Sequence, residues 1–176
     1  QYLVVDQKSF YASVECVARG LDPMTTNLVV ADPDRSRNTI CLAVSPSMKA
    51  LGVKNRCRIR DIPPNIPHIV APPRMQLYID CAAAIHGVFL RYIAPEDIYT
   101  YSIDESFIDV TPYLKMYGKS ARELAKEIIQ SVREIVGTVS TCGIGTNMYL
   151  AKVALDILAK HDPEFIAELN EDTYRE

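Results

Sequence analysis

The segment from residue 99 to residue 110, YTYSIDESFIDV, constrains the fold more than any other stretch of the chain. Apolar and β-branched residues alternate on both sides of one acidic pair, Asp104 and Glu105, which predicts two β-strands joined by a tight turn. Neighbouring carboxylates repel each other and normally avoid a half-buried sheet. A bound cation is the usual reason for such a pair, so we expect a metal site at this turn.

A third carboxylate, Asp6, ends a short apolar run at residues 2–5, which predicts a buried strand. Apolar residues at helical spacing follow from residue 9 to residue 18 and predict a helix packed on that strand. Helix capping is therefore an alternative role for Asp6. If the first strand lies beside the acidic hairpin, Asp6, Asp104 and Glu105 meet at one edge of the sheet.

The remaining pattern predicts an α+β fold of ferredoxin-like type, an antiparallel sheet with helices on one face. Three further helices and a last strand are expected at residues 74–93, 119–136, 148–160 and 165–169. Residues 21–73 are rich in proline and contain only short strand-like runs, which predicts a small inserted subdomain. We therefore expect one domain from residues 1–20 and 74–176, interrupted by this subdomain.

The composition argues against several classes of protein. The chain of 176 residues is 48% hydrophobic and 23% charged, which indicates a globular and not a disordered protein. No apolar run approaches the roughly 18 residues that a membrane span needs, and we expect no signal peptide at the N-terminus. The five cysteines are scattered without a C-x-x-C pair, which favours free thiols in a reducing cytoplasm over disulfides or a zinc site.

The charge is distributed unevenly along the chain. Residues 1–75 hold 10 basic and 6 acidic residues, whereas residues 76–176 hold 9 and 16. Five basic residues and no acid lie between Lys49 and Arg60. Such a patch can meet the phosphates of a nucleic acid or form a solvated loop, and charge alone does not decide between the two.

Four segments together resemble the Y-family translesion DNA polymerases. Residues 6–15, DQKSFYASVE, are similar to the first motif of that family, and residues 102–109, SIDESFID, to its S-I-D-E motif. CGIGTN at 142–147 with LAKVA at 150–154, and KALGV at 49–53, are similar to two further segments in matching order and spacing. The variant residues are closer to the UmuC-like branch, of ImpB/MucB/SamB type, than to the DinB-like branch.

The resemblance implies a role for each matched residue. Asp6, Asp104 and Glu105 match the catalytic carboxylates that bind two Mg²⁺ ions, and the backbone carbonyl of Gln7 matches a further metal ligand. The residues expected to hold the incoming nucleotide are Phe10, Tyr11, Ser45, Lys49 and Lys152. Tyr11 among them matches the steric gate, the aromatic ring under the sugar that would clash with a ribose 2′-hydroxyl.

Structural alternatives exist for these roles, and the chain departs from the family pattern at some positions, such as 8 and 46. Tyr11 could be a core aromatic, and the two lysines could be solvated helix residues. Glu15 falls within the first motif, and we expect it to be structural. Position 8, often a third acid in the family, is a lysine here, which we expect to point away from the metal or toward phosphate.

The function that the resemblance implies is template-directed DNA synthesis in damage tolerance and SOS mutagenesis. Primer–template DNA and a dNTP would be the partners, with a clamp or SOS accessory protein, no membrane, and a cytoplasmic location at the bacterial nucleoid. Residues 1–20 and 74–176 would form the palm and residues 21–73 the fingers, with the thumb and little finger outside this chain. The alternatives are a non-catalytic DNA- or partner-binding paralogue or fragment and a cyclase-like nucleotidyl transferase on the same fold.

Overall fold

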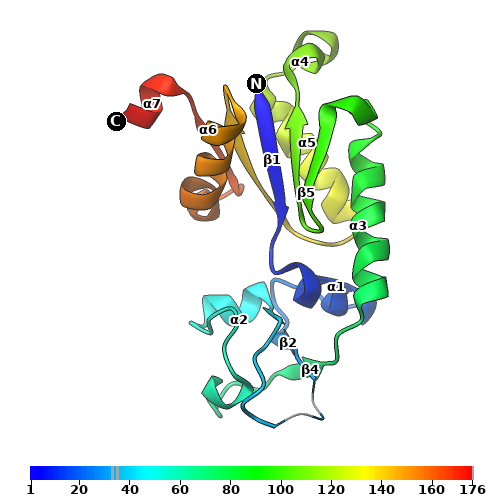
Figure 1. The fold of residues 1–176 in the computed structure, drawn as a ribbon, viewed down its shortest axis with the longest axis vertical. Helices are drawn as coiled ribbons and strands as arrows, with labels where there is room; N and C mark the ends of the chain where they lie inside the picture. The colour runs from blue at the N-terminus through cyan, green and yellow to red at the C-terminus, as the bar shows by residue number, and fades with distance from the viewer. Residues whose placement is uncertain (33, 35, 176) are drawn as a thin grey trace. The chain divides into compact units, whose positions relative to one another are not determined.

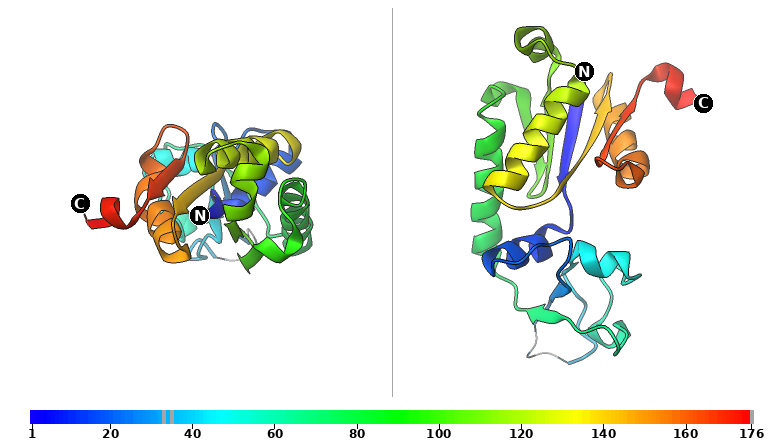
Figure 2. Two further views of the ribbon diagram at one scale, coloured as in Figure 1. Left: turned by 90° about the horizontal axis from the view of Figure 1, so that it is seen from above. Right: turned by 180° about the vertical axis from the view of Figure 1, so that it is seen from behind.

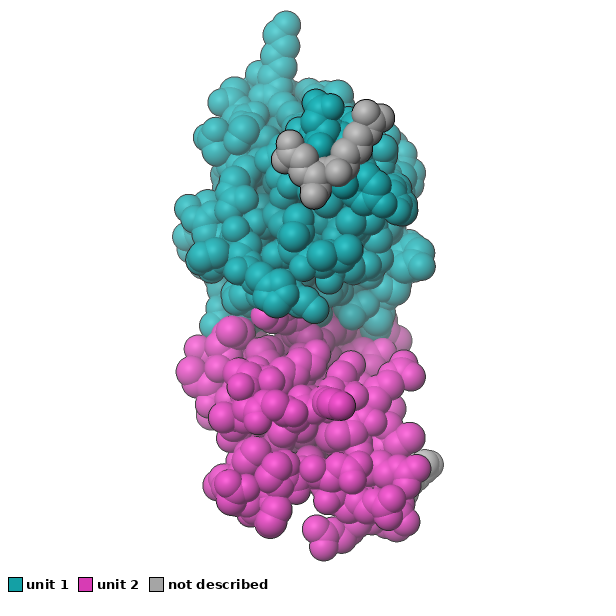
Figure 3. All heavy atoms as spheres, turned by 90° about the vertical axis from the view of Figure 1, so that its left-hand side faces the viewer, with its two compact units in different colours: residues 1–7, 82–176 teal, residues 8–81 magenta. Residues whose placement is uncertain are grey.

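The computed structural model of the protein describes residues 1–32, 34 and 36–175. Two compact units divide the chain: unit 1 comprises residues 1–7 and 82–176, and unit 2 comprises residues 8–81 (Figure 3). Helix α3 (Met75–Phe89) begins in unit 2 and ends in unit 1. Each unit is described by itself below.

Unit 1 is built on a five-stranded sheet with the order β5-β6-β1-β7-β8 (Figure 1). The central strand β1 (Tyr2–Gln7) runs antiparallel to β6 (Glu105–Asp109) on one side and to β7 (Ser140–Gly145) on the other. Strand β5 (Ile98–Ser102) pairs antiparallel with β6, and β8 (Ile166–Leu169) pairs parallel with β7. The predicted α+β class and the acidic hairpin are thereby confirmed.

Helices cover both faces of this sheet. Helix α5 (Ala121–Ile135) lies behind the sheet in Figure 1 and in front of it in the right-hand view of Figure 2, whereas α6 (Met148–Val153) lies on the opposite face. Val4 of β1 packs in the cluster on the α6 side. The sequence predicts helices on one face of the sheet only; α5 agrees with this prediction, whereas α6 lies on the other face. Gly143 and Gly145 lack a Cβ, which lets α6 approach β7 closely.

The other elements of unit 1 are short. Helix α4 (Thr111–Tyr117) follows the hairpin, and α7 (Glu171–Arg175) follows β8. The helix predicted at residues 148–160 begins as α6 and continues as a π-helical segment at Ala154–Leu158 and a 3-10 turn at Ala159–His161. The chain therefore stays helical to residue 161 but changes its winding twice.

Unit 2 has its own small core. Its three-stranded sheet has the order β3-β2-β4, with β2 (Leu28–Val30) antiparallel to β3 (Ala43–Val44) and parallel to β4 (Ile69–Ala71). Helices α1 (Phe10–Ala18) and α2 (Pro46–Ala50) complete it. A cluster of buried apolar side chains fills the space between sheet and α2: Val29, Ala31, Cys41, Val44, Met48, Val53 and Ile62.

The unit boundaries differ from the domain boundaries expected after residues 20 and 73. Helix α1 packs against β2 and β3 of unit 2, and the start of α3 is joined to α1 through the bonds of Arg74 and Tyr78 to Glu15. The assignment of residues to palm and fingers stays a prediction. The five cysteines are free thiols in this structure. No helix in the described ranges is long and apolar enough to cross a membrane.

Candidate active site

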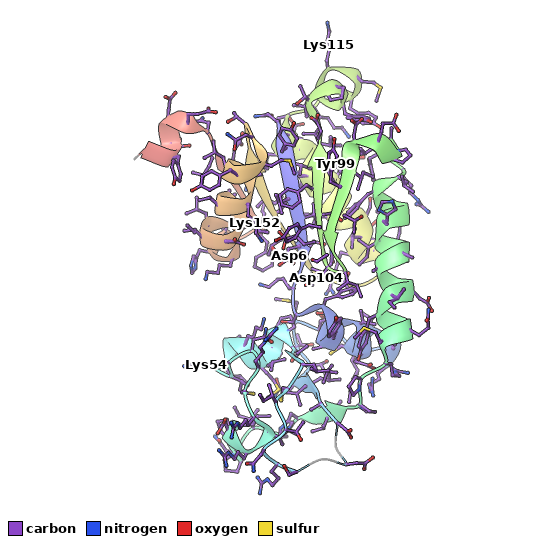
Figure 4. The ribbon with its side chains drawn as sticks, viewed as in Figure 1. Asp6, Lys54, Tyr99, Asp104, Lys115 and Lys152 are labelled. Atoms are coloured by element: carbon purple, nitrogen blue, oxygen red, sulfur yellow. The ribbon has the colours of Figure 1, made fainter. Side chains whose placement is uncertain are left out.

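The end of β1 and the start of β6 bring the three predicted carboxylates together. Asp6 and Glu105 are cross-strand partners in the β1–β6 register. The backbone N–H of Gln7 donates to the carbonyl oxygen of Asp104 at 3.0 Å, which holds the hairpin turn against the end of β1. Figure 4 shows Asp6, Asp104 and Lys152 at the same end of the sheet. The convergence expected from the sequence is therefore present.

This clustering has an electrostatic consequence for Asp6. Burial raises the pKa of the Asp6 carboxyl to about 7, and the negative charges of Asp104 and Glu105 contribute to the increase. The positive charge of Lys152 acts in the opposite direction but does not cancel it. The site thus holds more negative charge than its own cation neutralises, which is typical of sites that bind metals or react.

Lys152 supplies the positive charge that contacts this group. Its Nζ lies 2.6 Å from Oε1 of Glu105 and 3.2 Å from Oδ1 of Asp156. Burial lowers the pKa of Lys152, but the hydrogen bonds to Glu105 and Asp156 outweigh it, so its pKa lies above the ordinary value. Asn147 caps α6 by accepting a 2.8 Å hydrogen bond from the backbone N–H of Leu150.

The side chain of Gln7 has a structural role that sequence reasoning missed. It is buried, and its Oε1 accepts hydrogen bonds from the hydroxyls of Thr138 at 2.9 Å and Ser140 at 3.0 Å. These bonds anchor the last residue of β1 to the segment that leads into β7. The signal in the sequence was a pair of hydroxyl residues at the start of an apolar strand.

The oxygen ligands at this edge of the sheet fit a divalent cation in chemistry and charge. Carboxylate oxygens and a backbone carbonyl are the hard ligands that Mg²⁺ prefers, and a cation would offset the repulsion that raises the pKa of Asp6. Within the described part of the chain, however, no three or more His, Cys, Asp or Glu side chains are arranged to hold a metal ion. The Glu105 carboxylate is directed to Lys152.

An apolar groove of about 390 Å³ opens beside Lys152. It is lined by the aromatic residues Tyr99, Tyr101, Phe107 and Tyr149, together with Thr100 and Met148. Tyr99 is the cross-strand partner of Phe107, and Tyr101 packs edge-on against Phe107 with ring centroids 5.5 Å apart. Tyr101 and Tyr149 remain 68% and 62% exposed. These rings offer flat surfaces on which a sugar or a base can pack.

Unit 2 holds the remaining predicted nucleotide-binding residues. Phe10 is buried, whereas Tyr11 is partly exposed and stacks on Tyr78 with ring centroids 4.5 Å apart and planes at 16°. Tyr11 is thus not a fully enclosed core aromatic. One face of its ring is supported by Tyr78, which fixes its plane.

The residues just before α1 are unusual in conformation and charge. Ser9, and not Asp6, is the N-cap residue; its φ of 47° is left-handed, and its hydroxyl has no hydrogen-bond partner among the described residues. Burial lowers the pKa of Lys8, and the neighbouring charge of Lys49 lowers it further. A strained residue, an unsatisfied hydroxyl and two neighbouring lysines are features that favour an anionic ligand.

Ser45 has a structural function in unit 2. It is fully buried and is the N-cap of α2, where its Oγ accepts from the backbone N–H of Met48. The same hydroxyl accepts from Leu28 N at 3.1 Å and donates to the carbonyl oxygen of Thr26 at 2.7 Å. The hydroxyl is therefore already bonded within the protein, and nucleotide binding by Ser45 stays a prediction.

A carboxylate cluster at a sheet edge, with a lysine from an adjacent helix, thus defines the candidate site of this α+β domain. Residues 5–156 match the family described as impB/mucB/samB, and the chain therefore belongs to that family. The family prediction is confirmed, while the branch within the family stays a prediction.

Individual relatives agree with the family. The chain is 39% identical over 167 residues to the "Putative UV-damage repair protein UvrX" of Bacillus subtilis (strain 168), covering 94% of this chain and 38% of the relative. It is 35% identical over 176 residues to "DNA polymerase IV 2" of the same organism, covering 98% and 41%. The solved "Y-family DNA polymerase chimera Dbh-Dpo4(243-245)-Dbh" superposes with a TM-score of 0.78 at 26% identity, covering 97% and 49%. The chain thus spans about two fifths of the length of these curated relatives.

Proposed function

We propose that this chain is the catalytic palm and fingers part of a Y-family translesion DNA polymerase. The reaction would be attack of a primer 3′-hydroxyl on a dNTP paired with the template base. The observation that carries the proposal is the cross-strand pair of Asp6 and Glu105, with Asp104 in the adjoining turn. Two carboxylates on paired strands and a third in the adjoining turn form a negatively charged site, as positioning and electrostatic catalysis require.

Asp6, Asp104, Glu105 and the backbone carbonyl of Gln7 are the groups that would hold two Mg²⁺ ions. When bound, such ions lower the pKa of an attacking hydroxyl and stabilise the charge of a leaving pyrophosphate. The hydrogen bonds that anchor the end of β1 and the hairpin turn keep these ligands in place. The protein's own contribution is therefore to orient the ligands and to concentrate negative charge.

The cationic and aromatic groups supply nucleotide binding in this proposal. Lys152 would contact the triphosphate, and its ion pair with Glu105 keeps its head at the carboxylate edge. Lys49 and Lys8 would provide further positive charge in unit 2, beside the strained N-terminus of α1. Tyr11 would act as the steric gate against ribonucleotides, with Phe10 packed behind it as part of the core.

The biological setting follows from the relatives and is part of the proposal. Their names refer to UV-damage repair and to DNA polymerase IV, which supports synthesis across damaged DNA. The setting would be the bacterial cytoplasm during an SOS response. Primer–template DNA and a dNTP would be the substrates. A clamp or accessory protein would bind outside the residues described here.

Primer extension by the full-length protein with Mg²⁺ tests the proposal. We expect wild type to extend a primer and Glu105→Ala to lose roughly 10³-fold or more in rate. Glu168→Ala is the matched control, because Glu168 is an exposed glutamate on β8 of the same sheet, and it should extend like wild type. Equal extension by Glu105→Ala would contradict the assignment of the site. No extension by wild type on either damaged or undamaged template would favour a non-catalytic DNA-binding protein.

A further inference from the structure

Glu15 is a fully buried carboxylate on α1 that the proposed reaction does not use. Its side chain is 0% exposed. Arg19, the C-cap residue of α1, binds it with Nη1 2.6 Å from Oε1. Arg74, at the N-terminal side of α3, binds both oxygens through Nε at 3.1 and 3.2 Å and also through Nη2.

The fourth donor to Glu15 is the hydroxyl of Tyr78 on α3. This hydroxyl donates to Oε2 of Glu15 at 2.6 Å, and the Tyr78 side chain is fully buried. Burial raises the pKa of Glu15, but the hydrogen bonds from Arg74, Tyr78 and Arg19 outweigh it, so its pKa lies below the ordinary value. Glu15 is thus ionised at neutral pH, and a charge-assisted bond of this kind is short and directional.

Tyr78 connects this network to Tyr11. The ring of Tyr78 is held at its hydroxyl by Glu15, and its face stacks on Tyr11 with centroids 4.5 Å apart and planes at 16°. Tyr11 is partly exposed and lies one turn before Glu15 on α1. All of these residues belong to unit 2, so the contacts that lead from Glu15 through Tyr78 to Tyr11 lie within one compact unit.

We propose that Glu15 is a positioning residue for sugar selection, which sets the plane of Tyr11 by fixing the ring of Tyr78 on which Tyr11 stacks. A steric gate discriminates by a clash with one hydroxyl group, so a ring that can tilt admits a ribose more readily. The inference rests on the proposed function, since Tyr11 can select a sugar only in a polymerase. It predicts a specificity role for two residues that need not touch the nucleotide.

The first experiment measures kcat/KM for a dNTP and for the matching rNTP in single-nucleotide insertion by the full-length protein. Tyr78→Phe keeps the stacked ring and removes only the hydroxyl that binds Glu15. We expect it to reduce the preference for the dNTP by roughly 3- to 10-fold, mainly through a better kcat/KM for the rNTP. Glu15→Gln, which keeps the shape of the side chain and removes its charge, should shift the ratio in the same direction.

Tyr113→Phe is the matched control. The hydroxyl of Tyr113 donates to Oδ2 of Asp97 at 2.6 Å, so it forms the same type of tyrosine–carboxylate bond in unit 1. We expect its dNTP preference to stay within about twofold of wild type. A general loss of folded enzyme lowers kcat/KM for both nucleotides equally and leaves the ratio unchanged, so an unchanged ratio in Tyr78→Phe and Glu15→Gln would overturn the inference.

A second experiment places Tyr78→Phe in the Tyr11→Ala background. If Tyr78 acts through Tyr11, the double variant should discriminate no worse than Tyr11→Ala alone, because coupled residues are not additive. Additive losses would show that Tyr78 acts by another route and would overturn the inference. Failure of wild type to extend any primer would instead reject the proposed polymerase function, so the two failures are distinguishable.

Discussion

Asp6 and Glu105 face each other across β1 and β6, at the point where both strands meet the acidic turn. Like charges in directly opposite positions destabilise an antiparallel pair. Burial raises the pKa of Asp6 to about 7, and the charges of Asp104 and Glu105 contribute to the increase. An ionised Asp6 therefore lowers the stability of the folded chain. Residues that lower stability while serving a reaction are the usual candidates for stabilising substitutions.

We therefore expect Asp6→Asn to raise the free energy of unfolding in metal-free buffer at pH 8, by roughly 1 to 3 kcal/mol. The amide keeps the shape of the side chain but removes the buried charge. Urea unfolding followed by circular dichroism measures the change. Glu96→Gln, which removes one charge from an exposed site in unit 1, is the control and should change stability by less than about 0.5 kcal/mol. A lower free energy of unfolding for Asp6→Asn than for wild type would contradict repulsion between the carboxylates at this edge of the sheet.

The Glu15 network predicts a pH-dependent contribution to stability. Because hydrogen bonds hold the pKa of Glu15 below its ordinary value of 4.5 in the folded chain, its stabilisation is present above pH 4.5 and is lost as the pH falls through the folded pKa. Glu15→Gln should cost roughly 2 to 4 kcal/mol at pH 7. The difference from wild type should shrink below pH 4.5 in urea titrations. An equal difference at pH 7 and in acid would rule out an ionised Glu15.

Lys152 should contribute to nucleotide binding more than to the chemical step. Lys152→Met keeps much of the aliphatic packing and removes the charge beside Glu105. We expect KM for the dNTP to rise about 10-fold with a smaller change in kcat, measured by steady-state primer extension. Lys160→Met, at an exposed position further along the same helical run, should leave both constants near wild type. A change confined to kcat would contradict triphosphate binding by Lys152.

The close contact between β7 and α6 predicts opposite effects for two Gly→Ala substitutions. A Cβ at Gly143 would lie 2.5 Å from the backbone nitrogen of Leu155 and closer still to the carbonyl oxygen of Ala151. Gly143→Ala should therefore destabilise by several kcal/mol, roughly 3 or more, and displace the helix that carries Lys152. Gly87→Ala in α3, where the Cβ meets nothing within 4 Å, should stabilise by about 0.5 to 1 kcal/mol. Thermal unfolding of both variants measures these changes in stability, and similar melting temperatures would contradict the packing argument.

Local patterns determined much of the fold. The acidic hairpin, the long helices α3 and α5 and the strands β1 and β8 follow from apolar periodicity and turn chemistry, which depend on residues near each other in the chain. The family resemblance likewise rests on short contiguous segments, and residues 5–156 match the family. Asn147 as a helix cap is predictable for the same reason.

Other features were decided only by tertiary structure, because they join residues that are distant in sequence. The register that sets Asp6 opposite Glu105, the ion pair of Lys152 with Glu105, and the bond from Tyr78 to Glu15 depend on how strands and helices pack. The place of α6 on the second face of the sheet depends on glycines whose missing Cβ atoms matter only once a helix lies over them. Hydrophobic periodicity predicts which side of an element is buried, but not which partner covers it. Packing therefore determined the geometry of a site whose residues the sequence alone had already identified as candidates.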